Sequence, residues 1–97
     1  MFDWENIRHF LAVARSGTLS GAARMLKVDH ATVSRRLSAL EDQMKTRLVE
    51  RLPRACKLTP VGQRVFELAQ AMEEDAYAIE RFLDASRSPL NGKVTLS

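Results

Sequence analysis

The sequence predicts a mainly α-helical fold, in which three short helices and a two-stranded hairpin precede one long helix. Three observations support this fold class. Apolar residues recur at helical spacing in four segments of the 97-residue chain. Residues 48–58 break that pattern with two short runs around a turn that contains proline. The last helical pattern, over residues 60–86, is much longer than the other three.

The first two helices are located by their capping residues. Asp3 is a suitable N-cap for a helix over about residues 4–16, which Gly17 would end. Ser20 is a suitable N-cap for a shorter helix over about residues 21–26. The alanines of this second helix are small enough to let another helix cross it closely.

A short turn leads into the third helix. Lys27 stands where the chain needs a left-handed conformation, at a cost of about 1 kcal/mol. Val28 is expected to be buried in this turn. Asp29 is a suitable N-cap for the third helix, which would run to about Lys45. Two short helices joined by such a turn are typical of a helix-turn-helix.

The hairpin and the long helix complete the predicted fold. Residues 48–51 and 56–58 are expected to form the two strands, since proline suits the turn between them. Thr59 as N-cap and Pro60 as first residue would begin the long helix. The predicted fold is therefore a winged helix-turn-helix, with three helices and a two-stranded wing, followed by a long dimerisation linker helix.

The third helix has two different faces. An apolar stripe of Val33, Leu37 and Leu40 would face the core. The opposite face is short, hydroxylic and basic, as a helix in the major groove of DNA requires. Its candidate DNA-binding residues are His30, Ala31, Thr32, Ser34 and Arg35. A plain solvated face is the alternative, and for His30 and Thr32 the residues alone favour neither interpretation.

Further candidate DNA contacts surround that helix. Arg36, on its flank, would reach a phosphate. Arg54 at the tip of the wing could enter an adjacent minor groove, and Arg51 adds to the basic charge of the wing. A solvated turn charge is the alternative for Arg54. Ser20 could present its hydroxyl to a phosphate, although a cap already has a structural reason to be there.

The charge distribution favours a polyanionic partner for the first part of the chain. Residues 1–60 hold 11 Lys and Arg against 6 Asp and Glu, whereas residues 61–97 hold 4 against 6. No apolar run is long enough to span a membrane, and the start lacks the pattern of a signal peptide. The single cysteine, Cys56, is expected to pack on the inner face of the wing rather than to sense redox state. These features predict a cytoplasmic protein with no membrane partner.

The motifs give no support to an enzyme. The two histidines, His9 and His30, lie on different predicted helices and lack metal-ligand spacing. The sequence has no glycine-rich phosphate loop, no nucleophile elbow and no matched acid–base pair. We therefore expect no catalytic residue, no metal site and no cofactor.

The long helix predicts a homodimer. At 1.5 Å per residue it would span roughly 40 Å, which is more than a domain of this size can cover. Its remaining apolar stripe would pair with a second copy of the chain. The expected interface residues are Val65, Leu68, Ala69, Met72, Ala76, Ile79, Phe82 and Leu83. A helix folded back over its own core is the alternative.

The end of the sequence carries a separate expectation. Residues 93–97 alternate as a strand does, yet a lone strand is not stable. They would be the first strand of a further C-terminal domain, with a disordered tail as an equal alternative. The expected organisation is a DNA-binding domain at 1–59, a linker and dimerisation helix at 60–86, and a hinge with the start of that further domain at 87–97.

A continuous pattern of residues carries a family resemblance. It comprises Phe10-Leu11-Ala12-Val13-Ala14, Ser16-Gly17-Thr18-Leu19-Ser20, Ala22-Ala23 with Leu26, Val33-Ser34-Arg35, Leu40-Glu41, Leu48 with Arg51, Arg54, Leu58-Thr59 and Gly62. With this combined spacing, residues 4–62 resemble the N-terminal winged helix-turn-helix of LysR-type transcriptional regulators. The long helix resembles their linker helix.

The resemblance implies a function and its partners. Such a protein would bind double-stranded DNA at an operator with an inverted repeat, as a homodimer that often assembles into a tetramer. The resemblance also implies a C-terminal effector-binding domain, which would begin after the hinge in residues 87–97, and a small-molecule effector would bind only that domain. The recognition helix of the family usually begins Ser-Gln-Pro/Ser-Ala, where this chain has Asp29-His30-Ala31-Thr32, and Val49 stands where phenylalanine is common. The rival hypotheses are a helical protein–protein interaction module without a specific DNA site, and a member of another winged-helix family.

Overall fold

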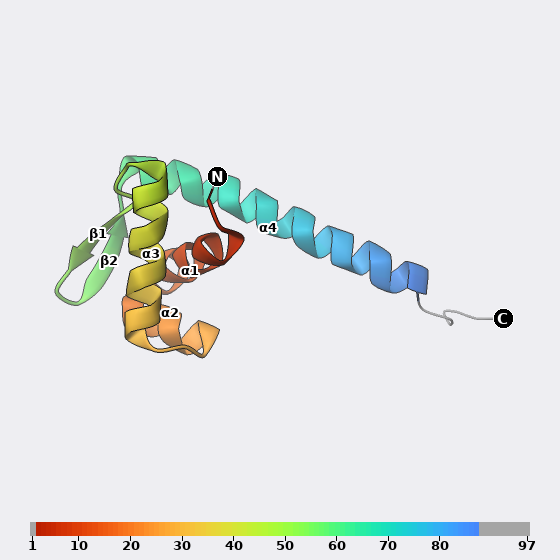
Figure 1. The fold of residues 1–97 in the computed structure, drawn as a ribbon, viewed down its shortest axis with the longest axis horizontal. Coiled ribbons are helices and arrows are strands. Elements are labelled where there is room, and N and C mark those ends of the chain that lie inside the picture. Colours follow the sequence, from red (N-terminus) through yellow and green to blue (C-terminus); the bar gives the residue numbers. More distant parts are fainter. Residues whose placement is uncertain (1, 88–97) are drawn as a thin grey trace.

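The computed structural model describes residues 2–87. Its elements are the helices α1 (Trp4–Ser16), α2 (Leu19–Leu26) and α3 (His30–Met44), the strands β1 (Val49–Leu52) and β2 (Ala55–Leu58), and the helix α4 (Pro60–Arg87). The first five elements form a small head, from which α4 projects (Figure 1). The predicted fold class is confirmed, whereas the predicted strand at 93–97 lies outside the described residues.

The start of α2 differs from the prediction. Thr18, not Ser20, is the N-cap, because the Thr18 hydroxyl oxygen accepts a hydrogen bond of 2.8 Å from the backbone N–H of Gly21. Ser20 lies within the first turn and is exposed. The earlier start brings Leu19 against the core, and the Ser16 hydroxyl donates to the Thr18 carbonyl at 2.8 Å. Thr18 and Ser20 both carry a hydroxyl that can cap a helix, so the packing of Leu19 on the core decides which of the two is the N-cap.

The turn between α2 and α3 combines one confirmed prediction and one wrong one. Lys27 has a left-handed backbone with φ of 58°, as predicted. Val28 is 37% exposed, so its predicted burial is wrong. The backbone N–H of Val28 bonds to the carbonyl of Ala23 at 3.1 Å and closes the end of α2. The backbone of Val28 is therefore fixed by this hydrogen bond, while the Val28 side chain is exposed to solvent.

The core of the head lies where α1 crosses α2 and α3. The apolar stripe of α3 is fully buried, with Val33, Leu37 and Leu40 each at 0% exposure. Small residues allow the close crossing of α2, where Ala22 and Ala23 are buried. The largest completely buried side chains are Phe10, Ile7, Leu11, Leu37, Leu40, Leu48, Val13, Val33 and Val49.

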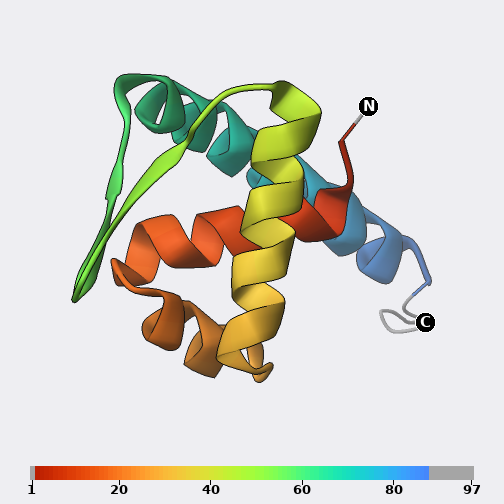
Figure 2. The same cartoon turned by 60° about the vertical axis from the view of Figure 1, so that its left-hand side comes forward.

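The wing is an antiparallel hairpin that is bonded to the end of α1. Its strands pair from Val49 with Leu58 to Leu52 with Ala55, which leaves a two-residue turn of Pro53 and Arg54. The backbone N–H of Cys56 donates to the carbonyl of Gly17 at 2.8 Å. This bond connects the wing to the end of α1, and the hairpin lies beside that end in Figure 2.

The helix α4 begins two residues after the end of β2 and then projects away from the head. The Thr59 hydroxyl oxygen accepts a hydrogen bond from the backbone N–H of Gly62 at 2.9 Å, as expected for an N-cap. At Gly62 a Cβ would overlap the carbonyl oxygen of Leu48, so the first turn can lie against the strand only because this residue is glycine. Within residues 2–87, no helix has the length and apolarity needed to cross a membrane.

Candidate nucleic-acid interface

The N-terminal turn of α3 presents several of the expected contact residues to solvent. The Asp29 carboxylate accepts a hydrogen bond of 2.7 Å from the backbone N–H of Thr32, which confirms the predicted cap. This interaction with Thr32 lowers the pKa of Asp29 below its ordinary value. His30, Ala31 and Arg35 are exposed on the turns that follow. The start of α3 is therefore a stable, solvent-facing end with short residues beside an arginine.

The two adjacent arginines of α3 have different surroundings. The guanidinium of Arg35 lies 3.4 Å from the Thr32 hydroxyl on the exposed face. The guanidinium of Arg36 donates to the Asn6 side-chain oxygen at 3.3 Å and lies 3.7 Å from the Asp3 carboxylate. Because these partners are in α1 and its cap, Arg36 lies on the flank of α3, as the sequence predicted.

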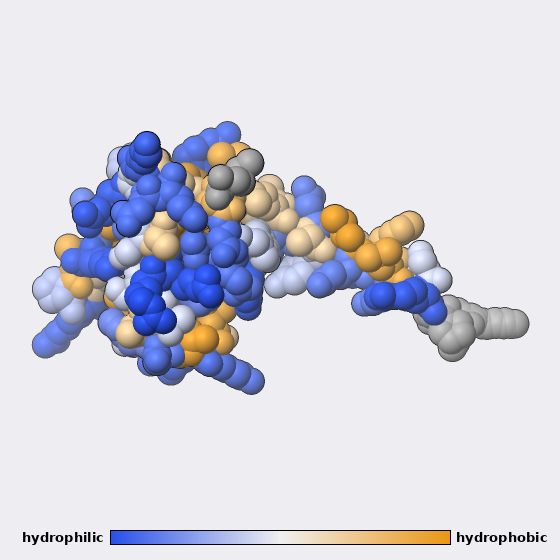
Figure 3. Space-filling view, viewed as in Figure 1, coloured by the Kyte–Doolittle hydropathy of each residue, from blue (hydrophilic) through white to orange (hydrophobic). Residues whose placement is uncertain are grey.

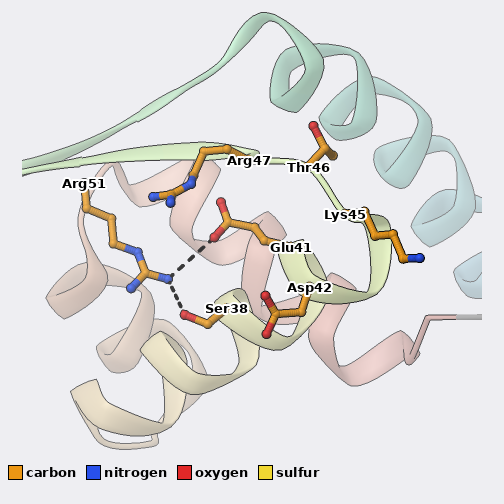
Figure 4. A pocket seen from close by; sticks show the side chains of 7 residues that line it. All are labelled: Ser38, Glu41, Asp42, Lys45, Thr46, Arg47 and Arg51. Atoms are coloured by element: carbon orange, nitrogen blue, oxygen red, sulfur yellow. Dashed lines mark hydrogen bonds and ion pairs between the residues drawn. The ribbon is translucent and has the colours of Figure 1, made fainter.

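Arg51 connects the wing to α3 (Figure 4). Its guanidinium donates to the hydroxyl oxygens of Ser34 at 3.2 Å and Ser38 at 2.9 Å, and to the Ser34 carbonyl at 3.4 Å. It also lies 3.9 Å from the Glu41 carboxylate. These bonds cross between strand and helix, so they hold β1 against the middle of α3.

Glu41 supports the same junction from the helix. One oxygen of its carboxylate accepts hydrogen bonds from the backbone N–H groups of Leu48 at 2.8 Å and Val49 at 3.1 Å. Its side chain is only 11% exposed. A carboxylate that receives two backbone donors fixes the start of β1 at the end of α3. The supporting roles of Glu41 and Ser38 were not predicted, because their partners lie in another element.

Part of the expected site surrounds a hollow of about 500 Å³ between α2, the start of α3 and the wing. Four expected residues line it: Ser20 from α2, His30 from α3, and Arg51 and Arg54 from the wing. Thr18 and Arg24 line it too, although neither was predicted as a contact from the sequence. The hollow combines hydroxyl and guanidinium groups with the N-terminal end of α2 at Thr18 and Leu19, and such groups bind phosphate.

A second hollow lies at the other end of α3, with a volume of about 580 Å³. Figure 4 shows its lining, which comprises Ser38, Glu41, Asp42, Lys45, Thr46, Arg47 and Arg51. Two acidic and three basic side chains line this hollow, and Arg51 and Glu41 already have partners within the head. The surface over α3 is largely hydrophilic in the view of Figure 3.

The expected dimer stripe on α4 is divided between the head and solvent. Ala69 is 2% exposed and lies in the core of the head, so its assignment to the dimer interface is wrong. Val65 is partly buried against the same core. Farther along, large apolar side chains are exposed, namely Leu68, Met72, Ile79, Phe82 and Leu83. They form apolar patches along the projecting part of α4 (Figure 3).

The geometry defines a class: a helix-turn-helix head with a wing and a protruding helix. Residues 4–63 match the family model described as the bacterial regulatory helix-turn-helix protein of the lysR family. The chain therefore belongs to the LysR family.

Curated relatives agree with this assignment. The chain is 41% identical over 90 residues to a probable hydrogen peroxide-inducible genes activator of Mycobacterium avium, a match that covers 93% of this chain and 29% of the relative. It is 34% identical over 89 residues to the transcriptional regulator TfdS of Cupriavidus pinatubonensis, covering 91% and 30%. The chain thus spans less than a third of the length of these relatives.

Solved structures share the fold. The DNA-binding domain of CbnR, crystallised with DNA, is 31% identical with a TM-score of 0.79, over 89% of this chain and 100% of that one. Full-length OxyR from Pseudomonas aeruginosa is 28% identical with a TM-score of 0.85, over 93% of this chain and 30% of that one.

Proposed function

We propose that this chain is the DNA-binding module of a LysR-type transcriptional regulator and recognises specific double-stranded sequences. The exposed first turns of α3 would lie in the major groove, with the wing on the adjacent minor groove or backbone. The observation that carries this proposal is the surface formed by the start of α3, the start of α2 and the wing tip. The similarity of the chain to the DNA-binding domain of CbnR, which was crystallised with DNA, supports the same role.

The surroundings of each residue suggest its contact. His30, Ala31, Thr32 and Arg35 would face base edges, because they lie in the exposed turns at the start of α3. Arg36 and Ser20 lie at the margins of this surface and would contact phosphates, and Arg54 would contact the backbone or minor groove. Ser34 would contribute less, since Arg51 already donates to its hydroxyl.

We infer that Arg51 acts mainly by positioning the wing. Its side chain is 30% exposed and its guanidinium is engaged by Ser34, Ser38 and Glu41. An arginine with these partners would have to give up several hydrogen bonds to reach DNA. This proposal changes the role expected for Arg51 from a direct contact to a support.

We further infer that the protein acts as a homodimer through α4, as a regulator rather than an enzyme. Five large apolar side chains of the predicted stripe are exposed on α4, and exposed apolar patches of this kind commonly mark protein–protein interaction sites. A two-fold dimer would present two copies of α3 and so favour an operator with an inverted repeat.

A tetramer and a small-molecule effector are properties that we propose only for a longer protein with a further domain. DNA binding would place its action in the cytoplasm of a bacterium.

The experiment that tests the proposal combines sequence selection with a salt series. Duplexes selected from a random library give a preferred site, and its affinity is compared with that of a scrambled duplex from low to high salt. We expect a preference for the selected site and a linear fall of log K with log salt, by about 0.9 per phosphate contacted. Equal affinity for both duplexes would contradict sequence-specific binding, and a flat salt response would contradict DNA binding through phosphates.

A further inference from the structure

The helix α4 contacts the head from its first turn as far as Glu73, and three of these contacts mark its path. Gly62 lies against the Leu48 carbonyl at the start of the helix. Ala69, about two turns later, is buried in the core. Glu73, one turn farther, bonds to Arg15 of α1. Glu73 is thus the polar attachment farthest from the wing among the described contacts of α4.

The Arg15–Glu73 ion pair has favourable geometry. One guanidinium nitrogen of Arg15 lies 2.7 Å from a Glu73 oxygen, and the other nitrogen lies 3.3 Å from the second oxygen. The side chains are 34% and 16% exposed, respectively. The hydrogen bond to Glu73 raises the pKa of Arg15, so the guanidinium stays charged. Two parallel N–H···O bonds restrain orientation as well as distance, which a single contact does not do.

Beyond this pair, α4 runs into solvent. Tyr77 lines the same small hollow as Arg15 and Glu73, and every residue from 77 to 87 is exposed. The segment from Ala69 to the end of α4 is about 27 Å long at 1.5 Å per residue. A tilt of about 7° at Ala69 would move its far end by about 3.3 Å, which is close to one base-pair step of DNA.

We propose that the Arg15–Glu73 ion pair sets the direction in which α4 leaves the head, and thereby the spacing between DNA half-sites that the dimer accepts. This inference rests on the proposed function, because it assumes a dimer through α4 that reads two half-sites. Half-sites one helical turn apart are about 34–36 Å from centre to centre, so an error of one base pair is a small fraction of the total. A modest restraint on the angle between α4 and the head is therefore sufficient to change which half-site spacing the dimer prefers.

The first arm of the test measures spacing preference. Duplexes carry two copies of the selected half-site, separated by spacers that differ by one base pair, and affinities are measured for the wild type and Glu73→Gln. We expect the ratio between best and neighbouring spacings to fall by about two- to five-fold, as for loss of a partly exposed ion pair. Affinity for a single half-site should not change, since Glu73 lies outside the α3 surface.

Two further variants make this arm specific. Glu67→Gln is the matched control, because Glu67 pairs with Arg64 on α4 itself at 3.2 Å and does not bridge to the head. It should leave the spacing ratio unchanged. Reversal of the pair in Arg15→Glu with Glu73→Arg should restore at least half of the lost preference. An unchanged ratio in Glu73→Gln, or an equal loss in Glu67→Gln, would overturn the proposal.

The second arm needs no DNA. Spin labels are placed at Asp42→Cys on α3 and Arg81→Cys on α4 in a Cys56→Ser background, and the doubly labelled chain is diluted into unlabelled protein so that distances within one chain are measured. We expect Glu73→Gln to broaden this distance distribution and Glu67→Gln to leave it narrow. A narrow distribution in Glu73→Gln would overturn the proposal. If the wild type lacks sequence-specific binding, the proposed function fails, whereas this arm still tests the restraint on α4.

Discussion

At the residue scale, the angular position of a side chain on α3 decides whether it is exposed to a partner or bonded to the rest of the head. Arg35 and Arg36 are neighbours in sequence, yet Arg35 lies beside Thr32 on the exposed face and Arg36 bonds to Asn6 of α1. Val33, on the opposite side of the helix from Arg35, is completely buried. One turn of helix therefore supplies a core residue, an exposed guanidinium and a flanking one, and each is expected to respond differently to substitution.

The first prediction compares Arg35→Ala with Arg54→Ala. Loss of Arg35 should weaken the selected site more than a scrambled one, because a bidentate contact to guanine gives about 1–3 kcal/mol of discrimination. Loss of Arg54 should weaken both more evenly and reduce the salt slope by about one unit if it contacts one phosphate. Binding titrations with both duplexes measure the difference. An equal loss on both duplexes for Arg35→Ala would identify it as a phosphate contact instead.

The second prediction concerns Arg51. Arg51→Met retains much of the aliphatic stem but removes the donors to Ser34 and Ser38, so unfolding free energy should fall by about 1–2 kcal/mol. Arg54→Met at the exposed wing tip is the matched control and should change stability by less than about 0.5 kcal/mol. Chemical denaturation of both variants provides the measurement. Equal stability of the two would show that Arg51 does not hold the wing to α3.

The third prediction concerns pH and the Asp29 cap. The pKa of Asp29 is lowered by its hydrogen bonds with Thr32, so its contribution to stability is present above the pKa of the unfolded chain. It should be lost as pH falls through the lower pKa of the folded state. Asn can also cap a helix but does not titrate, so Asp29→Asn should lack this part of the acid dependence. Denaturation at successive pH values tests it, and identical profiles would contradict the role of the carboxylate.

At the element scale, α4 belongs to two environments. Its first turns complete the head, where Gly62 and Ala69 are buried. Its later turns expose Met72 at 42% and Ile79 at 60%. A single apolar periodicity runs through both parts, so the pattern alone does not show where the head ends and the proposed dimer surface begins.

The fourth prediction tests that surface. Met72→Asp or Ile79→Asp would bury a charge between paired helices and should give monomers, because an unpaired buried charge is strongly unfavourable. Arg81→Asp is the matched control, since it places the same carboxylate at an exposed position on the opposite side of the helix, and it should remain dimeric. Sedimentation gives the mass, and circular dichroism checks that the head is folded. Dimers of unchanged mass in both apolar variants would show that α4 is not the interface.

At the scale of the whole molecule, the extents of 57 × 24 × 18 Å reflect a compact head with a projecting helix. The basic excess is confined to residues 1–60, which are in or next to the head, while the charge of residues 61–97 is slightly acidic. This separation agrees with the proposed division of labour, in which the head contacts DNA and α4 contacts a second copy.

The sequence by itself determined the features that depend on local interactions. Capping residues, helical periodicity and the proline-containing turn predicted the six elements in their order, and Lys27 was correctly expected in a left-handed conformation. These features follow from contacts within a few residues along the chain. The exposed face of α3 was predictable for the same reason, since its angular position follows from 3.6 residues per turn.

Only the tertiary structure decided the features that depend on residues distant in sequence. Thr18 rather than Ser20 caps α2 because Leu19 packs on the core, and Ala69 is buried because α4 crosses the head. Arg51 bonds to Ser34 and Ser38, 17 and 13 residues away, and Glu73 pairs with Arg15, 58 residues away. No spacing rule links such positions, since the separation between partners is set by how the elements pack. The residues of the exposed α3 face therefore follow from the local sequence. The side chains that hold the wing against α3, and the direction in which α4 leaves the head, follow from how the elements pack.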